Sequence, residues 1–329
     1  MRMTVLASGS KGNSTVIATD NTRLLIDAGL SCRELLKRMA IAGEDPAALA
    51  AILITHEHQD HIAGIGVLAR RLRIPVYFTE PTHRAWVRML TPRTTITYAQ
   101  WLDHVQQEKA ARAQAAAAAT TEPDAPCQPE PDGNPAEPLA LCAAADPDED
   151  DTPAAKVDPT HLPAVEYFHA GVHFSIGDIS ITPFTIPHDA ADPCGFVFES
   201  ATDHARMAIA TDLGYMPPNV KAALRRIDVL LLESNHDLDM LKDGPYPWSV
   251  KQRVLSRVGH LSNHATAEFL ARDYDGGAHT IVLGHLSEQN NDPSLALLAA
   301  EQALNGRMSL LGNRVLLAQQ SAPLPSICL

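Results

Sequence analysis

Three histidines and one aspartate lie within six residues of this chain, in the pattern H-x-H-x-D-H, directly after the apolar run Ala51–Thr55. An apolar run of this length that ends in polar residues predicts a buried strand followed by a turn. His56 and His58, two positions apart, can converge on one metal ion, while Asp60 and His61 turn toward a second ion. The pattern therefore favours a binuclear Zn²⁺ or Mn²⁺ hydrolase over a histidine-rich surface loop.

The composition predicts a soluble globular protein. Of the 329 residues 45% are hydrophobic, and no run approaches the ~18 consecutive apolar residues of a membrane span. The first residues lead directly into a glycine-containing loop and lack the apolar core of a signal peptide. Five scattered cysteines without a C-x-x-C pair favour a reducing cytoplasm over a secreted disulfide framework.

The segment 106–160 differs in composition from the rest of the chain. It holds 16 alanines and 9 prolines, together with the acidic block Asp146–Asp151. Such a segment cannot bury enough apolar surface to offset the entropy of ordering it, so we expect it to be disordered. Residues 106–158 carry 12 acids and 3 bases and thus contribute −9 of the net charge of −13. The remainder, near −4, neither excludes nor indicates a nucleic-acid partner.

Strand and helix patterns alternate on both sides of this segment. The predicted strands are Thr4–Ala7, Thr15–Thr19, Arg23–Asp27, Ala51–Thr55, Ile74–Phe78, Val172–Ile176, Ile179–Ile186, Gly195–Glu199, Met207–Thr211, Asp228–Glu233, His279–Leu283 and Arg314–Ala318. The predicted helices are 32–42 after a capping box at Ser31, Ile62–Arg73, Glu80–Met89, Asn219–Arg226, Ser249–Val258, Asn263–Asp273 and Pro293–Leu304. Two β-rich halves flanked by helices predict an α/β fold, a four-layer αββα sandwich.

Three further candidate ligands each follow an apolar strand in the second half of the chain. They are His188, Asp212 and His285. Strand ends that face one edge of a sandwich can gather residues that are far apart in sequence. With the first motif they make seven ligands, the number that a filled two-metal site with a bridging carboxylate requires. Because the ligands lie on both sides of 106–160, we expect one domain over residues 1–329 with a disordered insertion, the alternative being a linker between two domains.

Several longer motifs are similar to one known family. They are Ala7-Ser-Gly-Ser-Lys-Gly-Asn-Ser14, Leu24-Leu-Ile-Asp-Ala-Gly29, Thr55-His-Glu-His-Gln-Asp-His-Ile62, Pro187-His-Asp-Ala-Ala-Asp192, Leu231-Leu-Glu-Ser-Asn-His-Asp237, Gly244-Pro-Tyr-Pro-Trp248, Gly259-His-Leu-Ser-Asn263 and Gly284-His-Leu-Ser287. On these residues the chain resembles the metallo-β-lactamase superfamily, and within it the YycJ/WalJ-like branch of bacterial nucleases. The resemblance covers about residues 4–105 and 165–318, and the long insertion departs from it.

The resemblance implies a role for each ligand. One ion would be held by His56, His58 and His188, the other by Asp60, His61 and His285, and Asp212 would bridge them. Asp27 matches an acid that steadies the site, although a loop-capping role before Ala28 and Gly29 is an equal alternative. Two such ions would activate a water molecule for attack on an electrophile.

The fold alone does not identify the substrate, because this superfamily cleaves β-lactams, thioesters and phosphodiesters. Glu233 and His260 match a carboxylate–histidine pair found beside the metals in related phosphodiesterases, where the imidazole can protonate the departing oxygen. Two clusters of basic residues suit a phosphate backbone, although solvated helix faces explain them as well. They are Arg70, Arg71 and Arg73, and Lys251, Arg253 and Arg257. Tyr246 and Trp248 are candidates either for stacking on bases or, slightly preferred, for anchoring their loop.

We therefore expect a cytoplasmic two-metal phosphodiesterase acting on nucleic acid, DNA in preference to RNA. The branch implies a 5′→3′ DNA exonuclease linked to repair, with Asp60, Glu233 and His260 as its catalytic residues. One alternative is a thioester or lactone hydrolase of the glyoxalase type. Another is a metal-stabilised interaction protein whose acidic segment recruits a partner. Zn²⁺ and Mn²⁺ suit the same ligands, and the sequence does not fix the oligomeric state.

Overall fold

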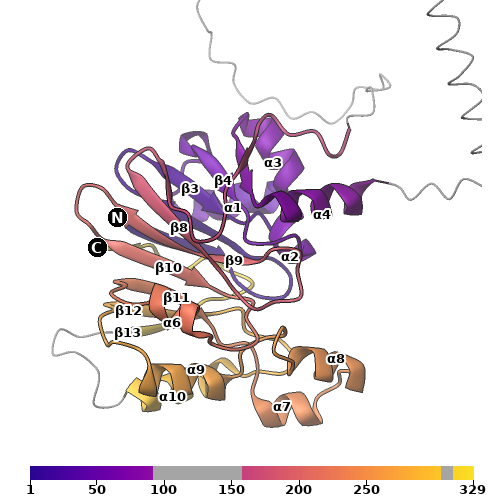
Figure 1. Ribbon diagram of the computed structural model, residues 1–329, viewed down its shortest axis with the longest axis vertical. Coiled ribbons are helices and arrows are strands. Elements are labelled where there is room, and N and C mark those ends of the chain that lie inside the picture. Colours follow the sequence, from indigo (N-terminus) through magenta and orange to yellow (C-terminus); the bar gives the residue numbers. More distant parts are fainter. Residues whose placement is uncertain (92–157, 305–313) are drawn as a thin grey trace, which may run out of the picture. The chain divides into compact units, whose positions relative to one another are not determined.

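The computed structural model describes residues 1–91, 158–304 and 314–329. In them the chain forms two seven-stranded sheets that are each covered by helices on one face (Figure 1). The predicted α/β sandwich is confirmed. Most of the predicted insertion lies outside the described residues, so its disorder and the single-domain reading stay predictions.

The first sheet is built mainly from the front of the chain. Its order is β14 (Ile327–Cys328), β1 (Arg2–Ala7), β2 (Ser14–Ala18), β3 (Arg23–Ile26), β4 (Ala51–Leu53), β5 (Val76–Phe78) and β6 (Val165–Tyr167). Its accompanying helices are α1 (Cys32–Ala42), α2 (Gln59–Ile62), α3 (Ile65–Leu72) and α4 (Glu80–Leu90). Strands β3 to β6 run parallel, so their carboxyl ends meet at one edge of the sheet.

The second sheet is built from the rear of the chain. Its order is β13 (Arg314–Leu317), β12 (Thr280–Gly284), β11 (Val229–Glu233), β10 (Arg206–Ala210), β9 (Cys194–Ser200), β8 (Ile179–Thr185) and β7 (Phe174–Ile176). The helices that follow its strands are α6 (Pro218–Ala223), α7 (Leu238–Asp243), α8 (Trp248–Val254), α9 (Asn263–Arg272) and α10 (Pro293–Leu304). Strands β10 to β13 are parallel, and β8 points the same way because two antiparallel pairings separate it from β10.

Three apolar clusters fill the spaces between the four layers of the sandwich. One lies between the sheets and joins side chains such as Ile17 and Leu53 with Phe196 and Ile209. The other two lie beneath the helices on the outer face of each sheet. Nearly continuous apolar strands, buried on both faces, are what this arrangement requires. None of the helices in the described ranges is long and apolar enough to span a bilayer.

Most of the predicted elements agree with the structure to within a few residues, but four elements were not predicted. They are strands β6 and β14, helix α7 and the 3₁₀ helix Pro46–Ala48. The helix predicted for Ile62–Arg73 is present as α3 but begins three residues later, because Ala63 and Gly64 separate it from the short helix α2. The Gly64 amide donates to Ala28, and a Cβ on Gly64 would lie 2.1 Å from the Leu30 carbonyl oxygen. Close packing of Gly64 against the loop after β3 therefore separates α2 from α3.

Gly29 provides a test of how tightly the loop after β3 packs against the metal-motif turn. A Cβ on Gly29 would lie 1.6 Å from the Asp60 carbonyl oxygen, whereas one on Gly277 would meet no atom closer than 3.4 Å. We expect Gly29→Ala to lower the free energy of unfolding by at least ~1–3 kcal/mol, the usual range for overpacking. Calorimetry should show a melting temperature several degrees lower for Gly29→Ala and an unchanged one for Gly277→Ala. Equal melting temperatures would contradict this packing.

Candidate metal centre

Three side chains reach the site from residues in left-handed backbone conformations at strand ends. Asp27 follows β3, Asp212 follows β10 and His285 follows β12, with φ angles of 60°, 61° and 55°. A positive φ is uncommon for residues other than glycine and costs conformational energy. Its occurrence at three strand ends on the same edge shows that the chain is bent sharply where these side chains meet.

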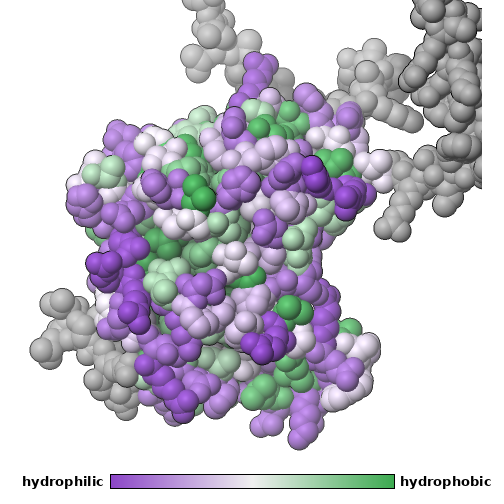
Figure 2. All heavy atoms as spheres, in the orientation of Figure 1, coloured by the Kyte–Doolittle hydropathy of each residue, from purple (hydrophilic) through white to green (hydrophobic). Residues whose placement is uncertain are grey.

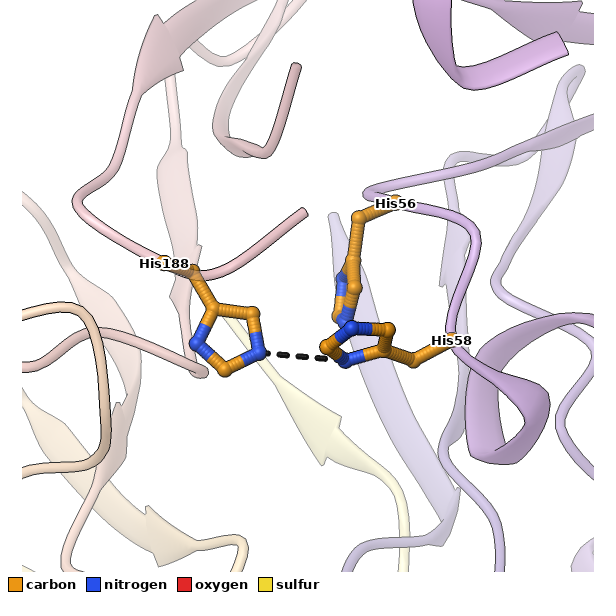
Figure 3. Close-up of side chains that lie close together, drawn as sticks. All are labelled: His56, His58 and His188. Atoms are coloured by element: carbon orange, nitrogen blue, oxygen red, sulfur yellow. Dashed lines mark hydrogen bonds between the residues drawn. The ribbon is translucent and has the colours of Figure 1, made fainter. Parts of the chain in front are cut away.

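The first group of candidate ligands consists of His56, His58 and His188. Figure 3 shows their rings turned toward one another, two from the turn after β4 and one from the loop after β8. The Nε2 atom of His188 lies 3.2 Å from Nδ1 of His58, and the ring centroids of His56 and His188 are 5.0 Å apart. The Nδ1 atom of His188 lies 3.2 Å from the Gly259 carbonyl oxygen, to which it can donate, so Nε2 remains for an ion.

Burial favours the neutral form of two members of this first group, His56 and His188. It lowers the pKa of His188, and it lowers the pKa of His56 well below the usual histidine value. A neutral imidazole is the form that binds a metal, because the coordinating nitrogen must be free of its proton.

The second group consists of Asp60, His61 and His285. Oδ2 of Asp60 lies 3.5 Å from Nε2 of His61 and 3.4 Å from Nε2 of His285. Burial raises the pKa of Asp60, but the two histidines outweigh it and hold that pKa far below its ordinary value. An ionised carboxylate and two imidazole nitrogens therefore face one point.

Asp212 lies between the two groups. Its Oδ2 is 3.3 Å from Nε2 of His61, and its Oδ1 is 3.4 Å from Nδ1 of His285. One ligand atom each from Asp212, His56 and His61 also lie within 4.8 Å of one another. Burial opposes ionisation, yet His285 and His61 hold the pKa of Asp212 well below its usual range. The Asp212 carboxylate is therefore within 3.4 Å of a candidate ligand from each sheet.

Two buried atoms show that the donor set fits a divalent cation. Nε2 of His56 has no hydrogen-bond partner among the described residues, and Oδ2 of Asp212 has none there besides its ion pair with His61. A buried polar atom without a partner is destabilising, and an ion coordinated by both would satisfy them. Burial works against protonation of His61 and His285, but the carboxylates around them, Asp212 first, raise the pKa of both well above normal. The same negative charge attracts a metal ion.

Asp27 contacts a candidate ligand rather than the loop that follows it. Its Oδ2 lies 2.8 Å from Nδ1 of His61, and its two oxygens accept hydrogen bonds from the amide and hydroxyl of Thr55. Burial raises the pKa of Asp27, and the charge of His61 opposes that rise. Of the two readings of Asp27, the steadying contact with His61 is the one that these distances favour.

Glu233 and His260 form the expected close pair beside the candidate ligands. Oε1 of Glu233 lies 2.7 Å from Nδ1 of His260 and 3.0 Å from Nδ1 of His285. Its Oε2 accepts hydrogen bonds from the amides of Leu213 and Leu261. Burial favours the protonated acid, but His260 and His285 lower the pKa of Glu233 to about 2. The carboxylate is therefore ionised at neutral pH and fixes the orientation of the His260 ring.

The family model that matches residues 7–248 is described as the metallo-beta-lactamase superfamily. The chain belongs to the metallo-β-lactamase superfamily. Exodeoxyribonuclease WalJ of Streptococcus pneumoniae is 32% identical over 90% of this chain and 85% of that protein. Exodeoxyribonuclease YycJ of Bacillus anthracis is 31% identical over 92% of this chain and 89% of that protein. The resemblance to this branch is thereby confirmed, and the chain is a metallo-hydrolase.

Solved structures share the fold at lower identity. The metallo-β-lactamase fold protein YhfI of Bacillus subtilis has a TM-score of 0.58 at 14% identity, with 98% of both chains covered. Zn²⁺-bound PqqB of Methylobacterium extorquens has a TM-score of 0.57 at 15% identity, covering 98% of this chain and 99% of that one. These similarities support the metallo-β-lactamase fold.

The glycine loop after β1 contributes a residue to which the sequence analysis gave no role. Nδ2 of Asn13 donates to Oδ2 of Asp60 at 3.1 Å and lies 3.0 Å from Nε2 of His61. The Ser8 hydroxyl, from the same loop, accepts a hydrogen bond from the His285 amide. The signal in the sequence was an asparagine beside Gly12, whose φ of +156° suits a residue without a side chain. The loop after β1 therefore contacts candidate ligands that follow strands of both sheets.

The predicted basic clusters are only partly free. Arg70 donates to the His161 carbonyl, and the Arg257 guanidinium lies 4.4 Å from the centre of the Tyr215 ring. Lys251 is buried and donates to a backbone carbonyl of α7, while Arg253 pairs with Asp189, beside His188. Four of the six predicted cations therefore make contacts within the protein. Arg253 remains 60% exposed next to the candidate metal centre.

Asp27→Asn tests whether Asp27 steadies one ion. The contact with His61 would be weakened while the shape of the side chain is kept, so we expect metal affinity to fall about 10- to 100-fold. The loss should affect the ion assigned to His61 and spare the one assigned to the first histidine group. Titration against a chromophoric chelator measures both affinities. Asp20→Asn, an exposed acid in the turn after β2, is the control. Unchanged affinities in Asp27→Asn would contradict the assignment.

Proposed function

We propose that the chain is a binuclear metal-dependent exodeoxyribonuclease that degrades DNA in the 5′→3′ direction. The observation that carries the proposal is the convergence of seven ligand side chains beside the Glu233–His260 pair. The names of the WalJ and YycJ relatives, which match most of this chain, add the substrate. The direction of cleavage, a role in DNA repair and a cytoplasmic location rest on the resemblance to that branch alone.

The seven side chains are assigned as a two-ion site. One ion is assigned to His56, His58 and His188, the other to Asp60, His61 and His285, and Asp212 to both. The ions are Zn²⁺ or Mn²⁺, since imidazole and carboxylate ligands suit either. When bound, they supply Lewis-acid activation of water and neutralise charge on the phosphate. Asn13 and Asp27 keep Asp60 and His61 in place through the hydrogen bonds and contacts described above.

His260 is assigned the proton transfer to the departing oxygen. Its Nδ1 lies 2.7 Å from Oε1 of the ionised Glu233, which holds the ring in place and leaves Nε2 for the substrate. Its side chain is 19% exposed, so the ring is open to substrate while its partner Glu233 is fully buried. A proton delivered to a 3′-oxygen removes the cost of expelling it as an anion.

The double variant His58→Ala and Asp60→Ala should keep its far-UV circular dichroism but lose metal and DNA cleavage. Each substitution removes a ligand from a different ion. Metal content by mass spectrometry and cleavage of labelled DNA are the measurements. The control variant carries His264→Ala and Asp20→Ala, which remove the same residue types from exposed positions. Undiminished cleavage by His58→Ala and Asp60→Ala would refute the mechanism.

His260→Ala should lower kcat for DNA about 10²- to 10⁴-fold while metal content stays unchanged, because general-acid catalysis is lost. His264→Ala, on α9, should match the wild type in both respects. A His260→Ala variant with normal kcat would remove His260 from the chemistry.

A panel of 5′- and 3′-labelled DNA and RNA decides substrate and direction. We expect mononucleotides released from the 5′ end of DNA only when Mn²⁺ or Zn²⁺ is added. Release from the 3′ end would reverse the proposed direction. Hydrolysis of S-acyl glutathione or homoserine lactone in place of DNA would favour the glyoxalase-type alternative.

A further inference from the structure

The segment 244–248, Gly-Pro-Tyr-Pro-Trp, joins α7 to α8 and is held rigidly. Pro245 and Pro247 each fix a backbone φ angle. Gly244 packs so closely that a Cβ would lie 2.3 Å from the Asn290 side-chain oxygen and 2.5 Å from the Met240 carbonyl oxygen. This connection therefore has little freedom to rearrange.

Trp248, the last residue of this segment, is nevertheless 65% exposed. It begins α8, and that helix is fixed to α7 because the buried Lys251 donates to the Lys242 carbonyl at 2.7 Å. Figure 2 shows apolar side chains gathered on the surface over α7 and α8, and Val250 and Leu255 are among the exposed ones. A large aromatic ring held in water on a rigid backbone is typical of a binding surface, because it loses little entropy when it is covered.

The chain after α8 and one small cavity connect the segment 244–248 to the candidate metal centre. The chain that leaves α8 reaches Gly259, whose carbonyl contacts His188, and then His260. Tyr246 lines a cavity of about 80 Å³ that His260 also lines, together with Ser10, Asn235 and Ser287. One aromatic residue of the segment thus borders the site, and the next lies exposed at the start of α8.

Charge favours a nucleic acid over an apolar partner here. Arg253, on the same helix as Trp248, pairs with Asp189 through one nitrogen and remains 60% exposed. Trp248 and Arg253 are five positions apart on α8, which places them about 7.5 Å apart along the axis and about 140° apart around it. A strand that crosses α8 would meet both side chains. Aromatic rings and cations are the two kinds of group that single-stranded nucleic acid binds.

We propose that Trp248 is a base-stacking platform that binds an unpaired nucleotide of the DNA strand being cleaved, with Arg253 contacting the backbone of that strand. The proposal deepens the exodeoxyribonuclease function and rests on it for the identity of the substrate. It assigns this surface to unpaired bases, since a base within a duplex is stacked on its neighbours and presents no free face to the ring.

Trp248→Ala should weaken binding of a fluorescein-labelled deoxythymidine decamer about tenfold, the change expected from the loss of one base–aromatic stack. Fluorescence anisotropy in EDTA measures the Kd without cleavage. With metal added, KM for single-stranded DNA should rise by a similar factor while kcat stays within about twofold. Trp248→Phe should restore most of the affinity. Leu298→Ala, which removes a 51% exposed apolar side chain from α10, should behave as the wild type.

Separate readouts distinguish failure of this inference from failure of the proposed function. An unchanged Kd and KM in Trp248→Ala would overturn the platform even if the wild type cleaves DNA. A wild type that binds the decamer through Trp248 but does not cleave it would overturn the nuclease function instead. If Trp248→Ala alters sedimentation of the protein alone and leaves Kd unchanged, the surface binds a second copy of the chain and the proposal is wrong. Equal melting temperatures exclude misfolding of the variant.

Discussion

The buried carboxylate of Asp212 connects the two halves of the candidate metal centre. One of its oxygens lies 3.3 Å from His61, which follows the first sheet, and the other lies 3.4 Å from His285, which follows the second sheet. These distances exist only because the two sheets pack face to face through the apolar cluster between them. Spacing within an apolar core, which is sensitive to a change of one methylene, therefore sets the geometry of a polar site.

The candidate metal centre includes three of the six non-glycine residues with positive φ angles among the described residues. In the same part of the chain, Nε2 of His56 has no hydrogen-bond partner, and Oδ2 of Asp212 has none besides its ion pair with His61. Strain and unmet polar groups at one place are typical of functional sites. The surrounding sandwich offsets them, because its strands are buried and hydrogen-bonded over most of their length. A bound cation would remove much of the remaining electrostatic cost.

The residues beside the ligands divide into supports and a substrate-facing rim. Asn13 and Asp27 hold Asp60 and His61, whereas Glu233 contacts both His260 and His285. Because Glu233 contacts the candidate ligand His285 as well as His260, it fixes the position of the proposed acid relative to the metal centre. The rigid connection 244–248 extends the same rim outward from His260 toward α8. Chemistry and strand binding are thus attributed to adjacent parts of the second half of the chain.

The sequence alone determined the α/β sandwich and the local placement of the ligands, because H-x-H-x-D-H and the apolar strands before His188, Asp212 and His285 are patterns within single short segments. It could not choose between the two readings of Asp27, assign Asn13, or reveal that Trp248 is exposed. Those facts depend on contacts between segments far apart in the chain, which strand register and sheet packing decide. Periodicity reports which face of an element is buried, but only the tertiary structure determines what that face meets.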